Sequence, residues 1–179
     1  MSSSTHQLTE KILALPARFA AHYRAGRRAR WTNEARTEFA VLVLLAGHLN
    51  WRGGDGASGE ARMRGAALLV APGETLEAHA AERTEYVALA IAPAVVLDCA
   101  VRARLTRADA LITFQTRAVA SDERLARLAR DLADELLEPA AGQDLVVAAL
   151  VEQLSIHLLR RYAHIRRADA VELSRVGLI

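Results

Sequence analysis

The spacing of hydrophobic residues changes near residue 118, and this change divides the chain into two parts. Before it, short apolar runs alternate with glycine, proline and charged residues, a pattern typical of β-strands and turns. After it, apolar residues recur every three or four positions, which is the spacing of amphipathic helices. The sequence therefore predicts an α+β fold in which the strands come first.

The strands of the first part are predicted at residues 39–51, 61–70, 85–91 and 111–116. The first of these runs is almost continuously apolar and ends in the glycine-rich segment 53–56, as a buried strand does when it enters a hairpin. Pro93 is suited to the first position of a helix, so a short helix is expected to run from there to about Arg104.

A first long helix is predicted to begin at Ser121, whose hydroxyl can cap the helix, and Asp122 and Glu123 favour its positive end. The helix is expected to end at Pro139, because the residue before a proline is disfavoured in helical conformation. Its apolar face consists of Leu125, Leu128, Leu132 and Leu136.

A second long helix is predicted over residues 144–165. One stripe of this helix consists of Val147, Val151, Leu154, Leu158, Tyr162 and Ile165. Further apolar residues widen the surface beyond a single seam, so the helix is expected to pack on two partners. We interpret one partner as the same helix in a second subunit, which makes this stripe the predicted homodimer interface. The alternative is a helix buried inside its own domain.

Composition and charge narrow the range of functions. A chain of 179 residues with 52% hydrophobic and 25% charged residues is expected to fold as one domain. The net charge of +2 includes arginine clusters at residues 24–30 and 160–167, for which a solvated surface is favoured over a phosphate site. No run is long enough for a membrane helix and no signal peptide is evident, so a cytoplasmic location is expected. The single cysteine, Cys99, is expected to be an ordinary buried residue.

The segment 64–74, R-G-A-A-L-L-V-A-P-G-E, together with the strands around it, resembles the cupin domain of AraC-type transcription regulators. Residues 121–163, from SDERLARLARDL to VEQLSIHLLRRYA, resemble the helical pair through which these regulators dimerise. The resemblance covers about residues 36–165.

The resemblance implies a cupin-like β-barrel, or jelly roll, followed by a C-terminal two-helix hairpin. It also implies a small-molecule effector inside the barrel, a homodimer, and contact with DNA only through a helix-turn-helix domain that this chain lacks. The expected organisation is residues 1–34 as an N-terminal extension, 35–118 as the barrel, 119–166 as the helical hairpin and 167–179 as a linker. Within the extension, Pro16 interrupts helical spacing, so a short helix and an added barrel strand both stay open.

Many cupin enzymes hold a metal ion with a His-x-His pair, a glutamate and a later histidine. The matching positions here are Glu34 and Arg36, Ala40 and Leu76, which do not provide that ligand set. We therefore expect no metal, no cofactor and no enzymatic activity. The alternative function is a small cupin enzyme, a metal-dependent isomerase or dioxygenase.

Ligand sites combine aromatic and apolar walls with a few polar groups. The residues that fit this description on or beside the predicted strands are Trp31, His48, Asn50, Trp51, Met63, His79 and Tyr86. For Trp51 and Met63 the alternative is plain barrel core, and for a histidine it is an exposed or hydrogen-bonded side chain.

Overall fold

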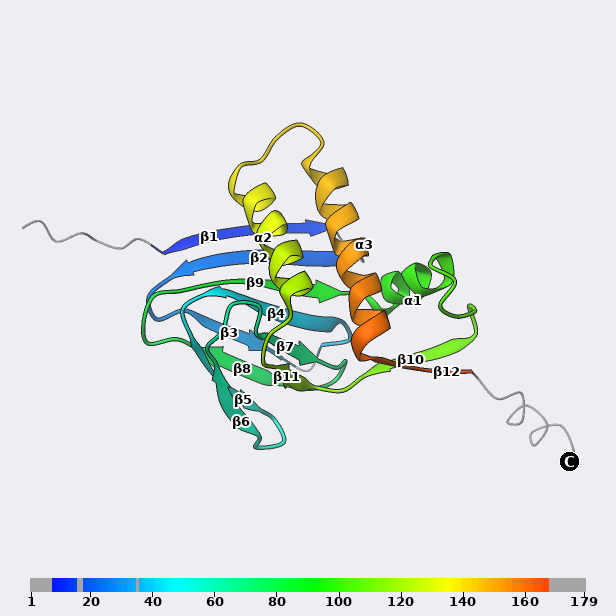
Figure 1. The fold of residues 1–179 in the computed structure, drawn as a ribbon, viewed down its shortest axis with the longest axis horizontal. Coiled ribbons are helices and arrows are strands. Elements are labelled where there is room, and N and C mark those ends of the chain that lie inside the picture. Colours follow the sequence, from blue (N-terminus) through cyan, green and yellow to red (C-terminus); the bar gives the residue numbers. More distant parts are fainter. Residues whose placement is uncertain (1–7, 16–17, 35, 168–179) are drawn as a thin grey trace, which may run out of the picture.

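The structure is a computed structural model that describes residues 8–15, 18–34 and 36–167. Two antiparallel sheets lie face to face, and helices cover one of them (Figure 1). The larger sheet contains, in spatial order, β1 (Thr9–Leu15), β2 (Phe19–Gly26), β9 (Thr84–Ile91), β4 (Phe39–Ala46), β7 (Ala67–Val70) and β11 (Arg117–Val119). The smaller sheet contains β3 (Arg30–Asn33), β8 (Leu76–His79), β5 (Leu49–Gly53) and β6 (Ser58–Ala61).

The strand pairing is nested. β2 pairs with β9, β3 with β8, β4 with β7, and β5 with β6, so the chain forms one long hairpin wound into two sheets. This is the arrangement of a double-sheet jelly roll, whose strands alternate between the two sheets. The predicted cupin-like barrel, followed by C-terminal helices, is confirmed.

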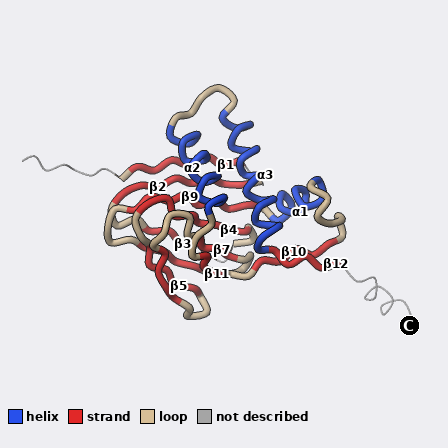
Figure 2. The backbone as a smooth tube through the Cα atoms, viewed as in Figure 1, coloured by secondary structure: helices blue, strands red, loops and turns tan. Residues whose placement is uncertain are grey.

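Three helices and a small two-stranded sheet complete the described part of the chain (Figure 2). Their bounds are α1 (Pro93–Arg102), β10 (Ala110–Phe114), α2 (Glu123–Leu137), α3 (Gln143–Tyr162) and β12 (Ala163–Arg167), and β10 pairs with β12. The second long helix is therefore shorter than predicted. Ile165 lies in β12, opposite Ile112, because the backbone becomes extended at Ala163. None of the helices in the described residues has the length and apolarity needed to cross a membrane.

Two hydrophobic cores follow from the two faces of the larger sheet. Residues that point outward from it, such as Phe19, Ala21 and Tyr23 of β2, pack against α1, α2 and α3. Residues that point inward, such as Leu42 and Leu44 of β4, pack against the smaller sheet and fill much of the barrel. Because successive side chains of a strand point to opposite faces, each central strand serves both cores.

The segment before residue 35 differs from its predicted role as an extension. β2 and β3 are central and edge strands of the barrel, so the barrel begins near residue 19, and of the two interpretations left open the added strand is the one found. β8 was not predicted. Residues 39–51 contain β4 and most of β5, and residues 61–70 contain β7 and only the last residue of β6. The proposed linker, residues 168–179, lies outside the described residues.

Asp122, and not Ser121, caps α2. Its carboxylate Oδ1 accepts hydrogen bonds from the backbone N–H groups of Arg124 and Leu125, at 2.9 and 3.1 Å. The cap sits against the turn before β7, where Gly65 has a φ of +80° and a Cβ would lie 2.8 Å from the Asp122 carbonyl oxygen. A side chain at Gly65 would therefore displace the start of α2.

Candidate functional site

A row of alanines forms the floor of a cavity that opens to solvent at one edge of the barrel. Ala20 of β2 lies opposite Ala90 of β9, and Ala90 lies opposite Ala40 of β4, so three neighbouring strands carry a small inward side chain at the same level. Ala88 occupies the next inward position of β9. Because an alanine side chain ends at Cβ, the space that larger residues fill elsewhere in the barrel stays open here.

The cavity measures about 350 Å³ and opens between β3, at the edge of the smaller sheet, and the β1–β2 edge of the larger one. This volume is at the lower end of the roughly 300–1,000 Å³ range of small-molecule sites. Besides the alanines, the lining residues are Ile12, His22, Arg30, Trp31, Thr32, Asn33, Arg36 and Leu89. The cavity thus combines an apolar floor with polar side chains at its rim.

The titratable residues that line the cavity are all basic. His22 Nε2 is buried and lies 2.7 Å from Glu10 Oε1, but the two are not aligned for a hydrogen bond. Arg30 Nη2 lies 3.4 Å from Glu77 Oε2, on the outer side of β3. The side chain of Arg36 has no ion-pair partner among the described residues. Arg36 is therefore the cation of the rim whose charge is least compensated.

The turn at residues 71–74 positions two polar residues, Asn33 and Arg36, at one end of the cavity. Asn33 is buried, and its Nδ2 donates a hydrogen bond to the Glu74 carbonyl oxygen at 3.0 Å. The Arg36 carbonyl oxygen accepts a hydrogen bond from Gly73 N–H at 2.8 Å. The backbone of Arg36 is thus held in place, although its side chain reaches solvent.

Deeper in the barrel, Arg24 and Tyr86 lie opposite each other on β2 and β9. Both donate hydrogen bonds to the carbonyl oxygen of Arg30, Arg24 from Nη1 at 2.9 Å and Tyr86 from its hydroxyl at 3.2 Å. Burial raises the pKa of Tyr86. Arg24 Nε is buried and has no hydrogen-bond partner in the described part of the chain. These contacts attach β3, which carries Trp31, to the larger sheet.

The neighbouring residues on the same two strands face the helices. Tyr23 donates a hydrogen bond from its hydroxyl to Glu85 Oε1 at 3.0 Å, and Arg130 of α2 binds both oxygens of that carboxylate. Burial raises the pKa of Glu85, but the hydrogen bonds from Arg130 and Tyr23 outweigh this effect and lower the pKa. Burial and the bond to Glu85 raise the pKa of Tyr23 to about 12.

Of the seven predicted ligand residues, only Trp31 lines the cavity. Trp51 and Tyr86 also pack against the inner core, but away from the cavity. Tyr86 is completely buried, and Trp51 lies over Gly59 of β6, where a Cβ would be 3.0 Å from its ring. For Trp51 the core interpretation is therefore the better one.

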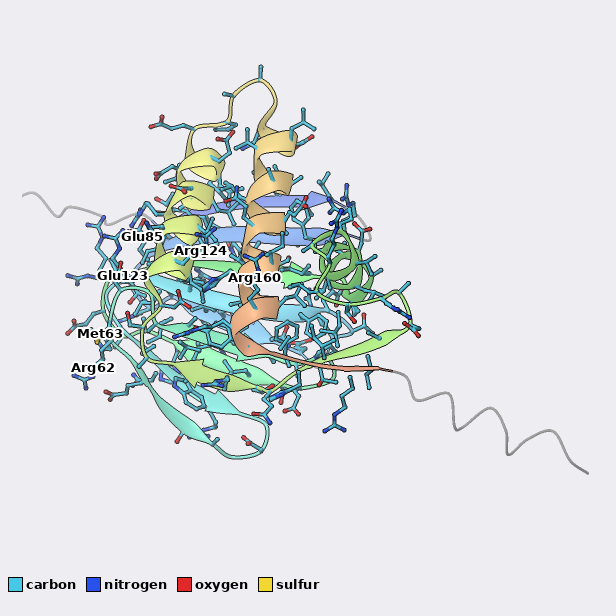
Figure 3. All side chains as sticks on the ribbon, turned by 45° about the vertical axis from the view of Figure 1, so that its right-hand side comes forward. Arg62, Met63, Glu85, Glu123, Arg124 and Arg160 are labelled. Atoms are coloured by element: carbon cyan, nitrogen blue, oxygen red, sulfur yellow. The ribbon has the colours of Figure 1, made fainter. Side chains whose placement is uncertain are left out.

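The other four predicted residues do not face the barrel interior. Asn50 and His79 lie opposite each other on the outer face of the smaller sheet and line an open hollow of about 460 Å³ together with Trp51, Glu60 and Glu77. Met63 is 62% exposed at a turn, where its side chain projects from the molecule (Figure 3). His48 is half-buried in the turn between β4 and β5, and its carbonyl oxygen accepts a hydrogen bond from Thr84. The sequence pattern did not separate inward from outward positions here, and His48 lies in a turn because residues 39–51 form two strands.

The predicted dimer stripe packs against the chain's own sheet. Val147, Val151, Leu154 and Leu158 are 0–6% exposed and belong to the core between α3, α2 and the larger sheet. Tyr162 is half-buried with its hydroxyl 2.5 Å from Asp122 Oδ2, and Ile165 lies in β12. The aliphatic side chains of the stripe, Val147, Val151, Leu154 and Leu158, therefore cannot form an exposed interface. The face of α3 that was chosen for the dimer interface was wrong. The periodicity had identified the buried side of the helix.

The exposed apolar side chains of α3 lie near its start instead. Leu145 is 78% exposed and Val146 is 44% exposed. Ala149, one turn further on, is exposed as well. This group, Leu145, Val146 and Ala149, is called the α3 tip below.

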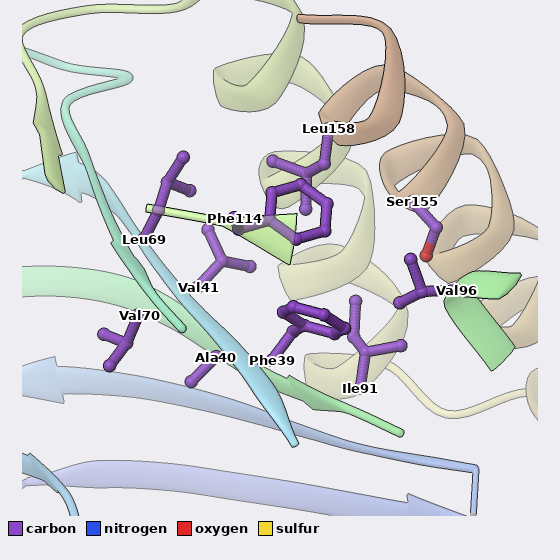
Figure 4. A pocket seen from close by; sticks show the side chains of 10 residues that line it. All are labelled: Phe39, Ala40, Val41, Leu69, Val70, Ile91, Val96, Phe114, Ser155 and Leu158. Atoms are coloured by element: carbon purple, nitrogen blue, oxygen red, sulfur yellow. The ribbon is translucent and has the colours of Figure 1, made fainter. Parts of the chain in front are cut away.

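A second, smaller hollow lies between the larger sheet and the C-terminal elements (Figure 4). Its volume is about 20 Å³, and its walls include Phe39 of β4 and Phe114 of β10, whose ring centroids are 4.7 Å apart. Among the described residues, the one polar side chain in its lining is Ser155, whose hydroxyl donates a hydrogen bond to the Val151 carbonyl oxygen at 2.8 Å. Such a void has space for about one water molecule, so it is a packing defect and not a ligand site.

In the described ranges, no three side chains of His, Cys, Asp or Glu come together in a group that could hold a metal ion. Cys99 is buried on α1, as predicted, and burial raises the pKa of its thiol.

Sequence reasoning missed His22, Asn33 and Arg36. All three lie in or next to the segment before residue 35, whose strands were not assigned. The alternation of residues along β2 could have revealed the strand. Phe19, Ala21 and Tyr23 form its buried face, and Ala20, His22 and Arg24 lie on the opposite face.

Comparison with known proteins gives similarity of fold only. No protein-family model and no curated protein sequence matches this chain. A conserved protein of unknown function from Streptococcus pyogenes is similar over 50% of this chain and 78% of that chain, at 12% identity and a TM-score of 0.43. A cupin superfamily protein from Desulfitobacterium hafniense is similar over 51% and 84%, at 12% identity and a TM-score of 0.43. An RmlC-like cupin with a double-stranded β-helix from Methanocaldococcus jannaschii is similar over 51% and 86%, at 8% identity and a TM-score of 0.43.

Proposed function

We propose that this chain is the effector-binding and dimerisation part of an AraC-type transcription regulator, with a binding and not a catalytic role. The observation that carries the proposal is the shared wall formed by β2 and β9. One face of these strands lines the barrel cavity, and the other face packs against the helical pair. A small molecule in the cavity therefore touches the same strands as the helices.

On each of these two strands, the residue that contacts β3 and the residue that faces the helices are neighbours in the sequence. Arg24 and Tyr86 hold β3 on the cavity side. On the helix side Tyr23 donates a hydrogen bond to Glu85, and Glu85 binds Arg130 of α2. A ligand that draws β3 toward the cavity would act on β2 and β9, and through Glu85 on α2. Two-state coupling of this kind requires that the ligand binds one arrangement better than the other.

The second copy of the chain is proposed to bind at the α3 tip. An apolar group at the end of a helical hairpin gains free energy when a second subunit covers it, and a two-fold arrangement lets the same residues serve both copies. Contact with DNA, and a cytoplasmic location where DNA is reached, belong to the same proposal and depend on a helix-turn-helix part outside this chain.

The test is a fusion of the whole chain to a helix-turn-helix domain that represses a reporter only as a dimer. Repression that depends on the chain, together with a dimer in sedimentation velocity, is the expected result. A monomer at all concentrations with no repression would refute the dimerisation function. Metal analysis of protein purified without chelators addresses the enzyme alternative, because a stoichiometric transition metal would favour it over the regulator.

A further inference from the structure

Three basic residues line the barrel cavity, and Arg36 is the one whose charge has no carboxylate partner in the described part of the chain. The described residues that line the cavity include His22, Arg30 and Arg36 and no acidic residue, and the Arg30 side chain lies toward the outer face of its sheet, beside Glu77. Two of the three have a carboxylate nearby, since Glu10 lies beside His22 and Glu77 beside Arg30. Arg36 has none within ion-pair distance among the described residues.

Arg36 lies where it can reach the contents of the cavity and its mouth. It lines both the cavity and the adjoining hollow, whose other charged residues are Arg18 and Glu38. The net charge of the residues that line this hollow is positive, because Arg18 and Arg36 outnumber Glu38. An anion entering the barrel from this side therefore meets a favourable potential, which low-dielectric walls strengthen.

The remaining walls are suited to a flat or short apolar group. The floor consists of Ala20, Ala40, Ala88 and Ala90, whose methyl groups present a shallow apolar surface. On the opposite sheet, Trp31 is half-buried and lies opposite the small residue Ala78, which leaves one side of the indole without a large neighbour in its sheet. A carbon skeleton can thus lie between an indole and an alanine row.

We propose that the cavity binds a small organic monocarboxylate, whose apolar body lies between Trp31 and the alanine row and whose carboxylate binds Arg36. Arg is suited to this role because its planar guanidinium can donate two parallel hydrogen bonds to a carboxylate. The inference rests on the proposed function, since it takes the cavity as the effector site.

The experiment compares acids with neutral molecules of the same shape. A panel of monocarboxylates and their primary amides, with benzoate and benzamide or hexanoate and hexanamide as pairs, is titrated into the whole chain by calorimetry. The Trp51→Phe variant, in which Trp31 is the only tryptophan, reports by fluorescence whether the compound reaches the cavity wall. We expect at least one acid to bind and to change Trp31 emission, with its amide bound roughly 10-fold to 100-fold more weakly.

Arg36→Gln is expected to remove the preference for the acid while the protein stays folded by circular dichroism. Arg36→Lys, which keeps the charge without the planar fork, should retain part of it. The matched control is Arg52→Gln, which removes an exposed arginine from the outer face of the smaller sheet and should leave the preference intact.

The outcomes separate this inference from the proposed function. If amides bind as tightly as the acids, or if Arg36→Gln keeps the preference, the carboxylate inference is wrong while a barrel that binds effectors stands. If no acid and no neutral compound of a metabolite screen binds or raises the Tm, both the inference and the effector-binding function are refuted.

Discussion

Glu85 on β9 and Arg130 on α2 form a two-point ion pair, with Arg130 Nη1 2.6 Å from Oε1 and Nη2 3.2 Å from Oε2. Arg130→Met should lower the free energy of unfolding by about 1–3 kcal/mol, because Glu85 would keep its burial and lose its charged partner. Urea unfolding followed by circular dichroism measures the change. Arg127→Met, at an exposed position of the same helix, is the control and should change stability little. Equal effects of the two variants would mean that the pair does not hold α2 on the sheet.

Asp122 joins the start of α2 to the end of α3. Its Oδ1 caps α2, and its Oδ2 lies 2.8 Å from His157 Nε2 and 2.5 Å from the Tyr162 hydroxyl. Asp122→Ala should cost about 2–4 kcal/mol of unfolding free energy, since it removes a helix cap and two partly buried hydrogen bonds. Ser121→Ala is the informative comparison and should cost much less, because Ser121 is exposed and is not the cap. A larger effect at Ser121 would contradict this assignment.

The pKa of Asp122 predicts how the free energy of unfolding depends on pH. Burial alone would raise the pKa of Asp122, but hydrogen bonds from Tyr162 and His157 outweigh it and lower the pKa from 3.8 to about 2. A carboxyl whose pKa is depressed on folding contributes stability above its unfolded pKa and loses it as pH falls through the folded value. The wild type should therefore lose about 2 kcal/mol from this group between about pH 5 and pH 2, and Asp122→Asn should lose none of it.

Unfolding curves at several pH values measure this dependence. Asp131→Asn, which neutralises an exposed carboxylate of α2, is the control and should keep the acid dependence of the wild type. An unchanged acid limb in Asp122→Asn would show that other carboxylates are responsible.

Substitutions at two leucines of α3 distinguish an effect on folding from an effect on association. Leu154 is 1% exposed and Leu145 is 78% exposed. Leu154→Asp should cost about 4 kcal/mol or more, because it buries a charge in the core. Leu145→Asp should leave stability within about 0.5 kcal/mol and convert the proposed dimer into a monomer. Sedimentation velocity and thermal unfolding test both, and a Leu145→Asp protein that still dimerises would place the interface away from the α3 tip.

Filling the cavity should abolish binding without harming the fold. Ala90 lies in the middle of the alanine row, opposite Ala20 and Ala40, and Ala90→Leu would place three further carbons in the open space. The Tm should stay the same or rise, because the added carbons occupy a void. Binding of the acids proposed above should weaken by roughly 10-fold or more, since the larger side chain takes their volume. Ala118→Leu, exposed on β11, is the control. A ligand that binds Ala90→Leu as tightly as the wild type does not bind in this cavity.

The change of spacing near residue 118 was enough to predict the fold class, because strands and helices bury their apolar residues with different periods. Strands such as β4 and β9 were found since both of their faces are buried and the runs are almost wholly apolar. β2 was left open because its inward residues, among them His22 and Arg24, interrupt the apolar pattern. The helical spacing of Leu8, Ile12, Leu15 and Phe19 also competed with the strand interpretation.

The candidate site was harder to predict for a physical reason. The cavity exists because Ala20, Ala40 and Ala90 share one level across three strands, and that level is set by strand register, which no local pattern encodes. The stripe on α3 posed the opposite problem. Its period identified the buried face correctly, but a period does not say whether the covering surface belongs to the same chain or to another.

The two-sided use of β2 and β9 determines which kinds of mutation this protein can tolerate. Substitutions at inward positions can alter the cavity while Tyr23 keeps its hydrogen bond to Glu85 and Glu85 keeps its ion pair with Arg130 of α2. Insertion or deletion of a single residue within either strand would instead exchange the two faces, turning Tyr23 toward the barrel and Arg24 toward the helices. Changes of ligand preference in related proteins are therefore expected to arise by point substitution in these strands, and changes of length to be confined to the turns.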